Sequence, residues 1–309
     1  MASSILENQS DLKAYIVTGP TSGIGRRAAF ELAKHGTVVL VGRDRLKLDD
    51  VRKAIERRHH HAVSVVCDLS DIASVRRAAE EIVALRLPLA GLLNNAGISP
   101  RRSMKTALSW DLTFVTNYLG PFALTDALVP HLPDGADVTF VASAVEDPER
   151  KIAVAAGFRG GRYVSAESSL RGEWVPGGSA SPTRDAYATS KQCVLAAAME
   201  FARETPRLRF NALEPGLTPN TGLARDFGVF VRFLAHYILP LFAPFMKYWS
   251  TAKRAGRVAA RVLINSSGQT GIYYNEKGQP MQGSARVRDP NFTGRVVAET
   301  RALLSTIPA

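Results

Sequence analysis

Tyr187 and Lys191 are the two residues whose types and spacing indicate proton-transfer chemistry. They lie four residues apart within Asp185–Glu204, a stretch with helical periodicity, so their side chains share one face of a helix. A nearby ammonium favours the phenolate and lowers the tyrosine pKa from ~10 toward neutrality, where a proton donor works best. The pair therefore predicts a general acid or base, although an ordinary amphipathic helix can carry the same two residues.

A glycine-rich turn, Thr18–Gly25, follows the first apolar run and precedes a segment with helical spacing. It reads Thr-Gly-Pro-Thr-Ser-Gly-Ile-Gly. Glycines let the backbone approach a pyrophosphate, and the N-terminus of the following helix faces that anion. The position of the turn between a strand and a helix favours a dinucleotide site over a turn that binds nothing.

The second apolar run ends in Gly42-Arg43-Asp44, which bears on the choice of cofactor. A guanidinium there can pair with the 2′-phosphate of NADP, whereas an acid accepts a hydrogen bond from the ribose 2′-hydroxyl of NAD. Because Arg43 comes first, we expect NADP (NADPH). Asp44 keeps NAD as an alternative, and a solvent-facing Arg43 without a ligand is another.

Apolar runs alternate with segments of helical periodicity along most of the chain. The expected strands are Lys13–Thr18, Thr37–Val41, Ala62–Cys67, Leu89–Asn94, Asp137–Ala142, Leu208–Leu213 and Gly271–Tyr274. The expected helices are Gly23–His35, Leu46–Arg58, a helix after Ser70 that ends at Arg86, Asp111–Val129, Asp185–Glu204 and Thr251–Asn265. This alternation predicts an α/β protein with a doubly wound parallel sheet, the Rossmann fold. No linker divides the chain, so residues 1–309 are expected to form one domain.

The ordered motifs resemble those of the short-chain dehydrogenase/reductase family, over roughly residues 10–275. After the glycine-rich turn come Asp68-Leu69, Asn94-Asn95-Ala96-Gly97, Asn117, Ser143, the Tyr-x-x-x-Lys of Tyr187-Ala188-Thr189-Ser190-Lys191, and Pro215-Gly216. Each follows the expected strand, or lies in the expected helix, where the family carries it.

The resemblance implies roles for these residues. Asn117, Ser143, Tyr187 and Lys191 would form the catalytic set. Ser143 would hydrogen-bond the substrate oxygen as charge develops on it, Asn117 would hold a water that links Lys191 to solvent, and Lys191 would bond the nicotinamide ribose. The expected cofactor-binding residues are Gly19, Thr21, Ser22, Gly23, Ile24, Gly25, Arg43, Asp68, Leu69, Asn95, Ala96, Gly97, Tyr187, Lys191, Pro215, Gly216 and Thr218.

Two segments distinguish this chain from a minimal member of that family. Residues 144–186 separate Ser143 from Tyr187 and form an insertion, which we interpret as a flap near the substrate mouth or as an unrelated surface excursion. Residues 217–250 are apolar and aromatic and occupy the position of the family's substrate lid. Such a lid favours a bulky hydrophobic substrate. The alternatives are peripheral membrane contact through 227–249 and packing on a partner subunit.

Pro215–Tyr274 resembles the branch that contains retinol dehydrogenases and light-dependent protochlorophyllide reductases. Cys193 stands where those reductases carry a cysteine, but the Tyr187–Lys191 motif differs from their usual Tyr-Lys-Asp-Ser-Lys. We therefore expect an NADPH-dependent oxidoreductase that acts on the CH–OH group of an alcohol or on the corresponding bulky, hydrophobic ketone or aldehyde. The alternatives are a tailoring ketoreductase for an aromatic polyketide, a reductase of a C=C bond, and a non-catalytic NADPH-binding protein.

Composition and charge limit the partners. An apolar content of 46% excludes wholesale disorder, and the two unclustered cysteines predict no metal site. From Lys247 onward, ten basic and three acidic residues carry +7 of the net +11. Their spread favours a solvated face, with an acidic substrate or membrane surface as alternatives, and excludes a nucleic-acid motif.

A polar N-terminus and the lack of a long uninterrupted apolar run predict a cytoplasmic protein. The family resemblance suggests a homodimer or homotetramer.

Overall fold

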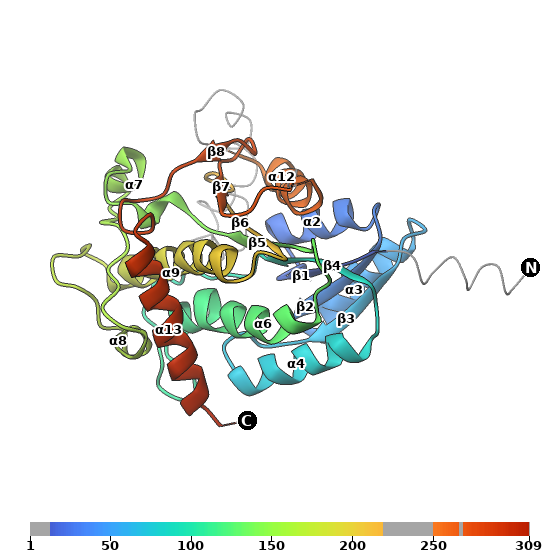
Figure 1. Cartoon of the computed structure of the whole chain (residues 1–309), viewed down its shortest axis with the longest axis horizontal. Helices are drawn as coiled ribbons and strands as arrows, with labels where there is room; N and C mark the ends of the chain where they lie inside the picture. The colour runs from blue at the N-terminus through green and yellow to red at the C-terminus, as the bar shows by residue number, and fades with distance from the viewer. Residues whose placement is uncertain (1–12, 219–249, 266–267, 309) are drawn as a thin grey trace, which may run out of the picture.

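A mostly parallel sheet forms the centre of the molecule (Figure 1). The structure is a computed structural model that describes residues 13–218, 250–265 and 268–308. Within these residues, the strands are β1 (Ala14–Thr18), β2 (Thr37–Gly42), β3 (Ala62–Val66), β4 (Leu89–Asn94), β5 (Asp137–Val141), β6 (Arg209–Leu213), β7 (Ile272–Tyr274) and β8 (Pro280–Met281). Their order is β3-β2-β1-β4-β5-β6-β7-β8. Neighbours up to β7 pair in parallel and β8 is antiparallel. The predicted Rossmann fold is therefore confirmed.

Helices cover both faces of the sheet. On one face lie α2 (Gly23–Leu32), α3 (Arg45–Glu56) and α12 (Ala252–Ile264). On the other lie α4 (Ile72–Ala84), α6 (Gly120–Leu128) and α9 (Pro182–Glu204), with α13 (Pro290–Thr306) packed against α9 (Figure 1). Because both faces are covered, β1 and β5 are buried at every position. This explains why β1 is a nearly continuous apolar run, while β5 buries Asp137 and Thr139 beside its apolar residues.

The helix expected over Asp111–Val129 is interrupted in its middle. The segment contains a short helix α5 (Leu112–Phe114), a π-helical turn η1 (Val115–Leu119) and then α6. Pro121 has no N–H to donate to the carbonyl four residues before it, so the regular α-helical ladder is broken there. Such π-turns occur often at functional sites, and this one contains Asn117.

Two regions contain elements that periodicity does not predict. The 144–186 insertion contains a 3₁₀ turn η3 (Ala144–Glu146) and the short helices α7 (Lys151–Ala155) and α8 (Ala166–Arg171). The 17-residue helix α13 follows the last predicted strand. Its start carries ordinary signals, since the Asp289 side chain caps it and Pro290 occupies its first position.

The predicted apolar lid, residues 217–250, lies outside the described residues except for positions 217, 218 and 250. The segment 227–249, for which membrane contact is an alternative, lies wholly outside them. Among the helices that are described, none combines the length and apolar character needed to cross a membrane.

Candidate functional site

The glycine-rich turn after β1 has the close backbone packing that a phosphate site requires. Gly19 has a φ of +66°, a conformation that favours glycine. A Cβ added at Gly25 would lie 2.3 Å from both the Gly19 carbonyl oxygen and the Asn95 Nδ2. No side chain fits there, so this position requires glycine and the turn packs directly against Asn95. The remaining predicted residues of the turn lead into α2: Thr21, Ser22, Gly23 and Ile24.

The loop after β4 is bonded directly to that turn. Thr18 Oγ1 accepts the backbone N–H groups of Asn95 at 2.9 Å and Ala96 at 3.0 Å. Asn95 Nδ2 donates to the Thr18 carbonyl at 2.9 Å. The ends of β1 and β4 are thereby joined where the strand order reverses, which is the place where doubly wound sheets bind ligands.

Arg43 and Asp44, at the end of β2, have different surroundings. The Arg43 side chain is exposed. Asp44 caps α3: its Oδ1 accepts the Lys47 N–H at 3.1 Å and its Oδ2 pairs with Lys47 Nζ at 2.5 Å. These contacts lower the pKa of the Asp44 carboxyl, the largest cause being the side-chain hydrogen bond to Lys47. The Asp44 carboxylate, which kept NAD as an alternative cofactor in the sequence analysis, is thus engaged in helix capping.

Asp68 and Leu69 follow β3 and have largely structural contacts. Asp68 Oδ1 accepts the N–H of Ser70 at 2.9 Å and its hydroxyl at 2.7 Å. Leu69 is buried in the core, and its carbonyl lies so close to Gly120 that a Cβ there would be 2.1 Å away. The pair fixes the loop after β3 against the start of α6.

Tyr187 and Ser143 meet at the carboxyl ends of the strands. Ser143 follows β5 and Tyr187 lies in the second turn of α9. The Ser143 side chain is close enough to Tyr187 to lower the pKa of its hydroxyl, and both residues are only partly buried. A hydroxyl pair that remains accessible beside the glycine-rich turn can contact a substrate oxygen.

Lys191, Asn117 and Gly97 converge behind this hydroxyl pair. Lys191 is buried, and its Nζ donates to the Val141 carbonyl at 2.7 Å and lies 5.7 Å from the Tyr187 ring centroid. Asn117 Oδ1 accepts the Ile98 N–H at 2.7 Å, and its Nδ2 donates to the Ile98 carbonyl at 2.9 Å. A Cβ at Gly97 would lie 3.3 Å from Asn117 Oδ1 and 3.8 Å from Lys191 Nζ. The predicted catalytic residues are therefore neighbours in space.

The pKa directions at the site differ from the simple expectation that Lys191 lowers the pKa of Tyr187. Burial raises the pKa of Tyr187, the Glu214 charge raises it further, and the neighbouring Ser143 side chain lowers it. Burial lowers the pKa of Lys191 to about 8, against an opposing effect of Glu214. For both groups, desolvation of the charged form is the largest cause of the shift.

The chain is similar in sequence to known proteins. The family model described as short chain dehydrogenase matches residues 13–154. The short-chain dehydrogenase/reductase pkfC of Emericella nidulans is 30% identical over 236 residues, 70% of each chain. The chain belongs to the short-chain dehydrogenase/reductase family.

A further relative and a solved structure with the same fold are also similar to this chain. Human retinol dehydrogenase 13 is 35% identical over 127 residues, which cover 40% of this chain and 38% of that protein. The chain thus resembles the retinol dehydrogenase branch. A short chain dehydrogenase of Burkholderia cenocepacia, solved in complex with NADP, superposes with a TM-score of 0.62 at 22% identity, covering 88% of this chain and 99% of that one.

The structure of this family member has a residue at its site that the motifs did not indicate, Glu214. It follows β6, immediately before the predicted Pro215-Gly216 pair. Its carboxylate accepts the N–H of Ala144 and, at 3.0 Å, that of Gly216, and Tyr273 donates to it at 3.5 Å. An acid directly before Pro-Gly at a strand end is the only signal that the sequence offered.

The remaining predicted residues of the site lie just beyond β6. Gly216 has a φ of +76°, and its carbonyl accepts from the Thr218 hydroxyl at 2.8 Å. Thr218 is buried at the edge of the described segment. Together with Pro215, these residues place one further loop beside Ser143.

Cys193 lies on the same helix as Lys191 but is fully buried in the core. Burial raises the pKa of its thiol well above its usual value. It is therefore a neutral packing group, remote from exchange with solvent.

The shape of the site fits a nicotinamide cofactor. The region near Gly25 has no space for a side chain, and α2 begins in this turn, so that its first backbone N–H groups are of the kind that bind an anion. The exposed Arg43 extends from the end of the adjacent β2. These are the features that a dinucleotide phosphate needs, and they lie beside the Ser143–Tyr187 pair.

Proposed function

We propose that this chain is an NADPH-dependent oxidoreductase that transfers hydride to or from a bulky hydrophobic carbonyl or alcohol, with Tyr187 as the proton donor or acceptor. The observation that carries the proposal is the proximity of Tyr187 and Ser143, both partly exposed, with the Lys191 ammonium buried and 5.7 Å from the tyrosine ring centroid.

The chemistry divides between the cofactor and the protein. A bound NADPH supplies the hydride. Ser143 holds the carbonyl oxygen of the substrate, Tyr187 gives that oxygen its proton, and the developing charge is met by hydroxyl groups that are already positioned. Lys191 is fixed by the Val141 carbonyl, and its positive charge favours loss of the tyrosine proton.

The preference for NADP rests on the contrast at the end of β2. Asp44 is occupied as the cap of α3, whereas Arg43 is exposed and can pair with a 2′-phosphate. The NADP in the Burkholderia cenocepacia relative is consistent with this choice. We also propose that the set of cofactor-binding residues predicted from the sequence, whose first member is Gly19 and last is Thr218, binds this NADPH.

Carbonyl chemistry is preferred over light-dependent C=C reduction. A participating Cys193 would need access to the substrate and an ionisable thiol, but this thiol is buried and its pKa is raised. A tailoring ketoreductase would use the same Ser143 and Tyr187 and differs only in its substrate.

The proposal is tested by a screen for NADPH oxidation over hydrophobic aldehydes, ketones and quinones, in the dark and under illumination. We expect turnover of at least one bulky carbonyl in the dark, with NADH much less effective. Turnover that requires light, or NADPH binding without turnover of any compound, would contradict the proposal.

A further inference from the structure

Phe158, in the 144–186 insertion, lies beside the proposed proton donor. Its ring centroid is 6.3 Å from that of Tyr187, and the two rings are tilted by 53°. Phe158 is only partly buried, as is Tyr187. The two aromatic rings are therefore neighbours, and each remains partly exposed.

The loop that carries Phe158 is held on both sides. The Phe158 N–H donates to the Ala153 carbonyl at 3.0 Å, which closes the end of α7. Two residues later Gly160 lies against Pro148, where a Cβ would come within 2.8 Å. The Gly161 N–H then donates to the Glu146 carbonyl at 2.8 Å. These contacts define the backbone position of Phe158.

The same loop is bonded to α9, the helix that carries Tyr187. The Arg162 N–H donates to Thr189 Oγ1 at 2.9 Å, and the Tyr163 N–H donates to Gln192 Oε1 at 3.4 Å. A Cβ at Gly161 would be 2.4 Å from the Gln192 side chain. The insertion thus runs closely over the part of α9 that follows the proposed proton donor.

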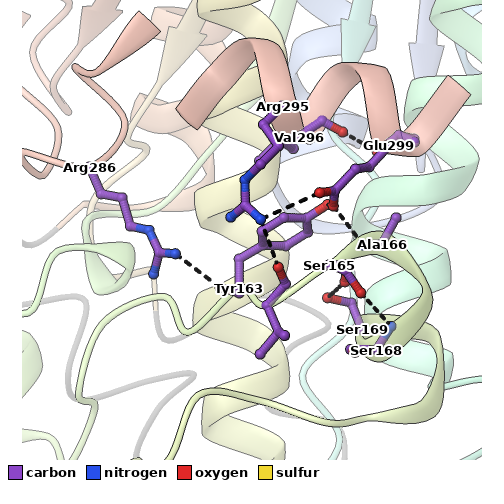
Figure 2. A network of polar contacts seen from close by, with 11 residues as sticks. Tyr163, Ser165, Ala166, Ser168, Ser169, Arg286, Arg295, Val296 and Glu299 are labelled. Carbon is purple, nitrogen blue, oxygen red and sulfur yellow. Dashed lines mark hydrogen bonds and ion pairs between the residues drawn. The ribbon is translucent and has the colours of Figure 1, made fainter. Parts of the chain in front are cut away.

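Helix α13 fixes the insertion from its outer side (Figure 2). Tyr163 is fully buried, and its hydroxyl donates to Glu299 Oε2 at 2.6 Å. The same oxygen accepts the Ala166 N–H at 3.3 Å, at the start of α8. The Tyr163 ring packs edge-on against Phe292 of α13 at 5.9 Å. We call the bond between Tyr163 and Glu299 the insertion clamp.

Two arginines from the basic C-terminal region reinforce this contact. Arg286 Nη2 donates to the Tyr163 carbonyl, and Arg295 Nη1 donates to the Val164 carbonyl, each at 3.1 Å (Figure 2). Arg295 also pairs with Glu299 at 3.4 Å. Part of the C-terminal positive charge is therefore used to hold the insertion.

We propose that Phe158 is a specificity-determining residue that selects substrates with an aromatic ring attached to the carbonyl carbon, and that the insertion clamp is the device that positions it. The inference rests on the proposed function, because it places the substrate carbonyl at Tyr187. It adds a substrate class, the aryl ketones and aryl aldehydes, to that function.

The physical basis is the preference of aromatic rings for tilted or offset partners. Ring pairs with centroids about 4.5–7 Å apart gain stability beyond the burial of their area. A substrate ring next to a carbonyl held at Tyr187 would meet the partly exposed Phe158 at such a distance. A saturated ring of equal size offers the same bulk but no aromatic face.

The test uses 1-tetralone and 1-decalone, two bicyclic ketones that differ in aromaticity. We expect the wild-type protein to favour 1-tetralone in kcat/KM. Phe158→Leu should raise KM for 1-tetralone by roughly threefold to tenfold, with kcat nearly unchanged and little effect on 1-decalone. Phe158→Tyr, which retains the ring, should behave as the wild type. Ile152→Ala removes an exposed apolar side chain, 41% accessible, from the same insertion and should leave both ketones unaffected.

The clamp is tested separately with two substitutions. Tyr163→Phe removes the hydroxyl but keeps the ring that packs on Phe292, and it should weaken the preference for 1-tetralone without changing NADPH affinity. Glu299→Gln keeps an acceptor oxygen and should preserve the preference. Equal kinetics of Tyr163→Phe and the wild type would refute the positioning role.

The outcomes separate this inference from the function beneath it. A wild-type protein that reduces 1-decalone as well as 1-tetralone, or that reduces neither, would overturn the substrate class. If Phe158→Leu matches the wild type while the separate variant Tyr187→Phe is inactive, the inference is refuted and the proposed function stands. Retained turnover in Tyr187→Phe would instead refute the function itself.

Discussion

The carboxylate of Glu214 accepts the backbone N–H of Ala144, the residue that follows Ser143. One side chain after β6 thus fixes the loop after β5 that carries the proposed substrate-binding hydroxyl. Its charge also acts on the two groups behind that hydroxyl, since it raises the pKa of Tyr187 and of Lys191. Arg150, Glu146 and Tyr273 interact electrostatically with Glu214 from the neighbouring elements.

Glu214→Gln should shift the pH profile of carbonyl reduction toward acid. Removing the negative charge lowers the pKa of Tyr187, and reduction needs the protonated tyrosine, so activity should fall at a lower pH on the alkaline side. A displacement of about one pH unit is expected for a charge at this range. The measurement is kcat against pH, with the melting temperature as a check on folding. A folded variant with an unmoved alkaline limb would show that Glu214 has no electrostatic influence.

Arg43→Ala should weaken NADPH binding by roughly tenfold or more, the expected loss for a charge-assisted hydrogen bond, and leave NADH binding nearly unchanged. The matched control is Arg45→Ala, which removes another exposed arginine two residues away. Dissociation constants for both cofactors can be measured by nucleotide fluorescence. Equal losses for NADPH and NADH would argue against the 2′-phosphate contact.

Gly25→Ala should abolish cofactor binding and lower the melting temperature, because its Cβ would lie 2.3 Å from the Gly19 carbonyl oxygen. Gly294→Ala provides the control, since a Cβ there, in α13, meets nothing nearer than 3.7 Å. That change should stabilise the protein by up to ~1 kcal/mol through helix propensity. Thermal unfolding and NADPH titration of both variants test the comparison, and an intact site in Gly25→Ala would contradict the close packing of the turn.

Glu146 should make the protein less stable at alkaline pH. Its carboxyl is fully buried, and accepts from the Ser284 N–H at 2.9 Å and the Ser284 hydroxyl at 2.6 Å. Burial raises its pKa from 4.5 to about 7. Folding therefore favours the protonated form: this contribution to stability is complete below pH 4.5 and is lost as the pH rises through 7.

Glu146→Gln, which stays neutral, should remove that pH dependence. Between about pH 5 and pH 8 the wild type should lose on the order of 1–3 kcal/mol more unfolding free energy than the variant. Urea unfolding at the two pH values measures the difference. Parallel profiles for the two proteins would mean that Glu146 does not titrate in this range.

The sequence was sufficient for the sheet and for most of the catalytic neighbourhood, because both depend on local patterns. Apolar runs predicted the parallel strands. The four-residue spacing of Tyr187 and Lys191 was enough to predict that their side chains share one face of a helix. The turn at Gly25 and the loop at Asn95 were recognisable motifs. The hydrogen bonds of Thr18 join this turn to this loop. They are expected once the ends of β1 and β4 are adjacent.

Other features depend on contacts between distant segments. The π-turn at Asn117 arises where Pro121 interrupts a pattern that is otherwise helical, so periodicity predicts one continuous helix. The place of Phe158 beside Tyr187 is set by a short loop and by the bond from Tyr163 to Glu299, 136 positions apart in the chain. Hydrophobic periodicity reports local structure and cannot predict a contact between residues so far apart in the chain. The same holds for Glu214, whose role depends on the backbone of Ala144.

The most direct test of the account is Tyr187→Phe, assayed for turnover of a hydrophobic carbonyl and for NADPH binding in the same preparation. The substitution keeps the ring beside Phe158 and Lys191 and removes only the hydroxyl on which Ser143 acts. We expect turnover to fall by at least about 10²-fold, the lower end of a general acid's contribution, with the dissociation constant of NADPH unchanged. Turnover at the wild-type rate with normal NADPH binding would contradict the assignment of Tyr187 as the proton donor.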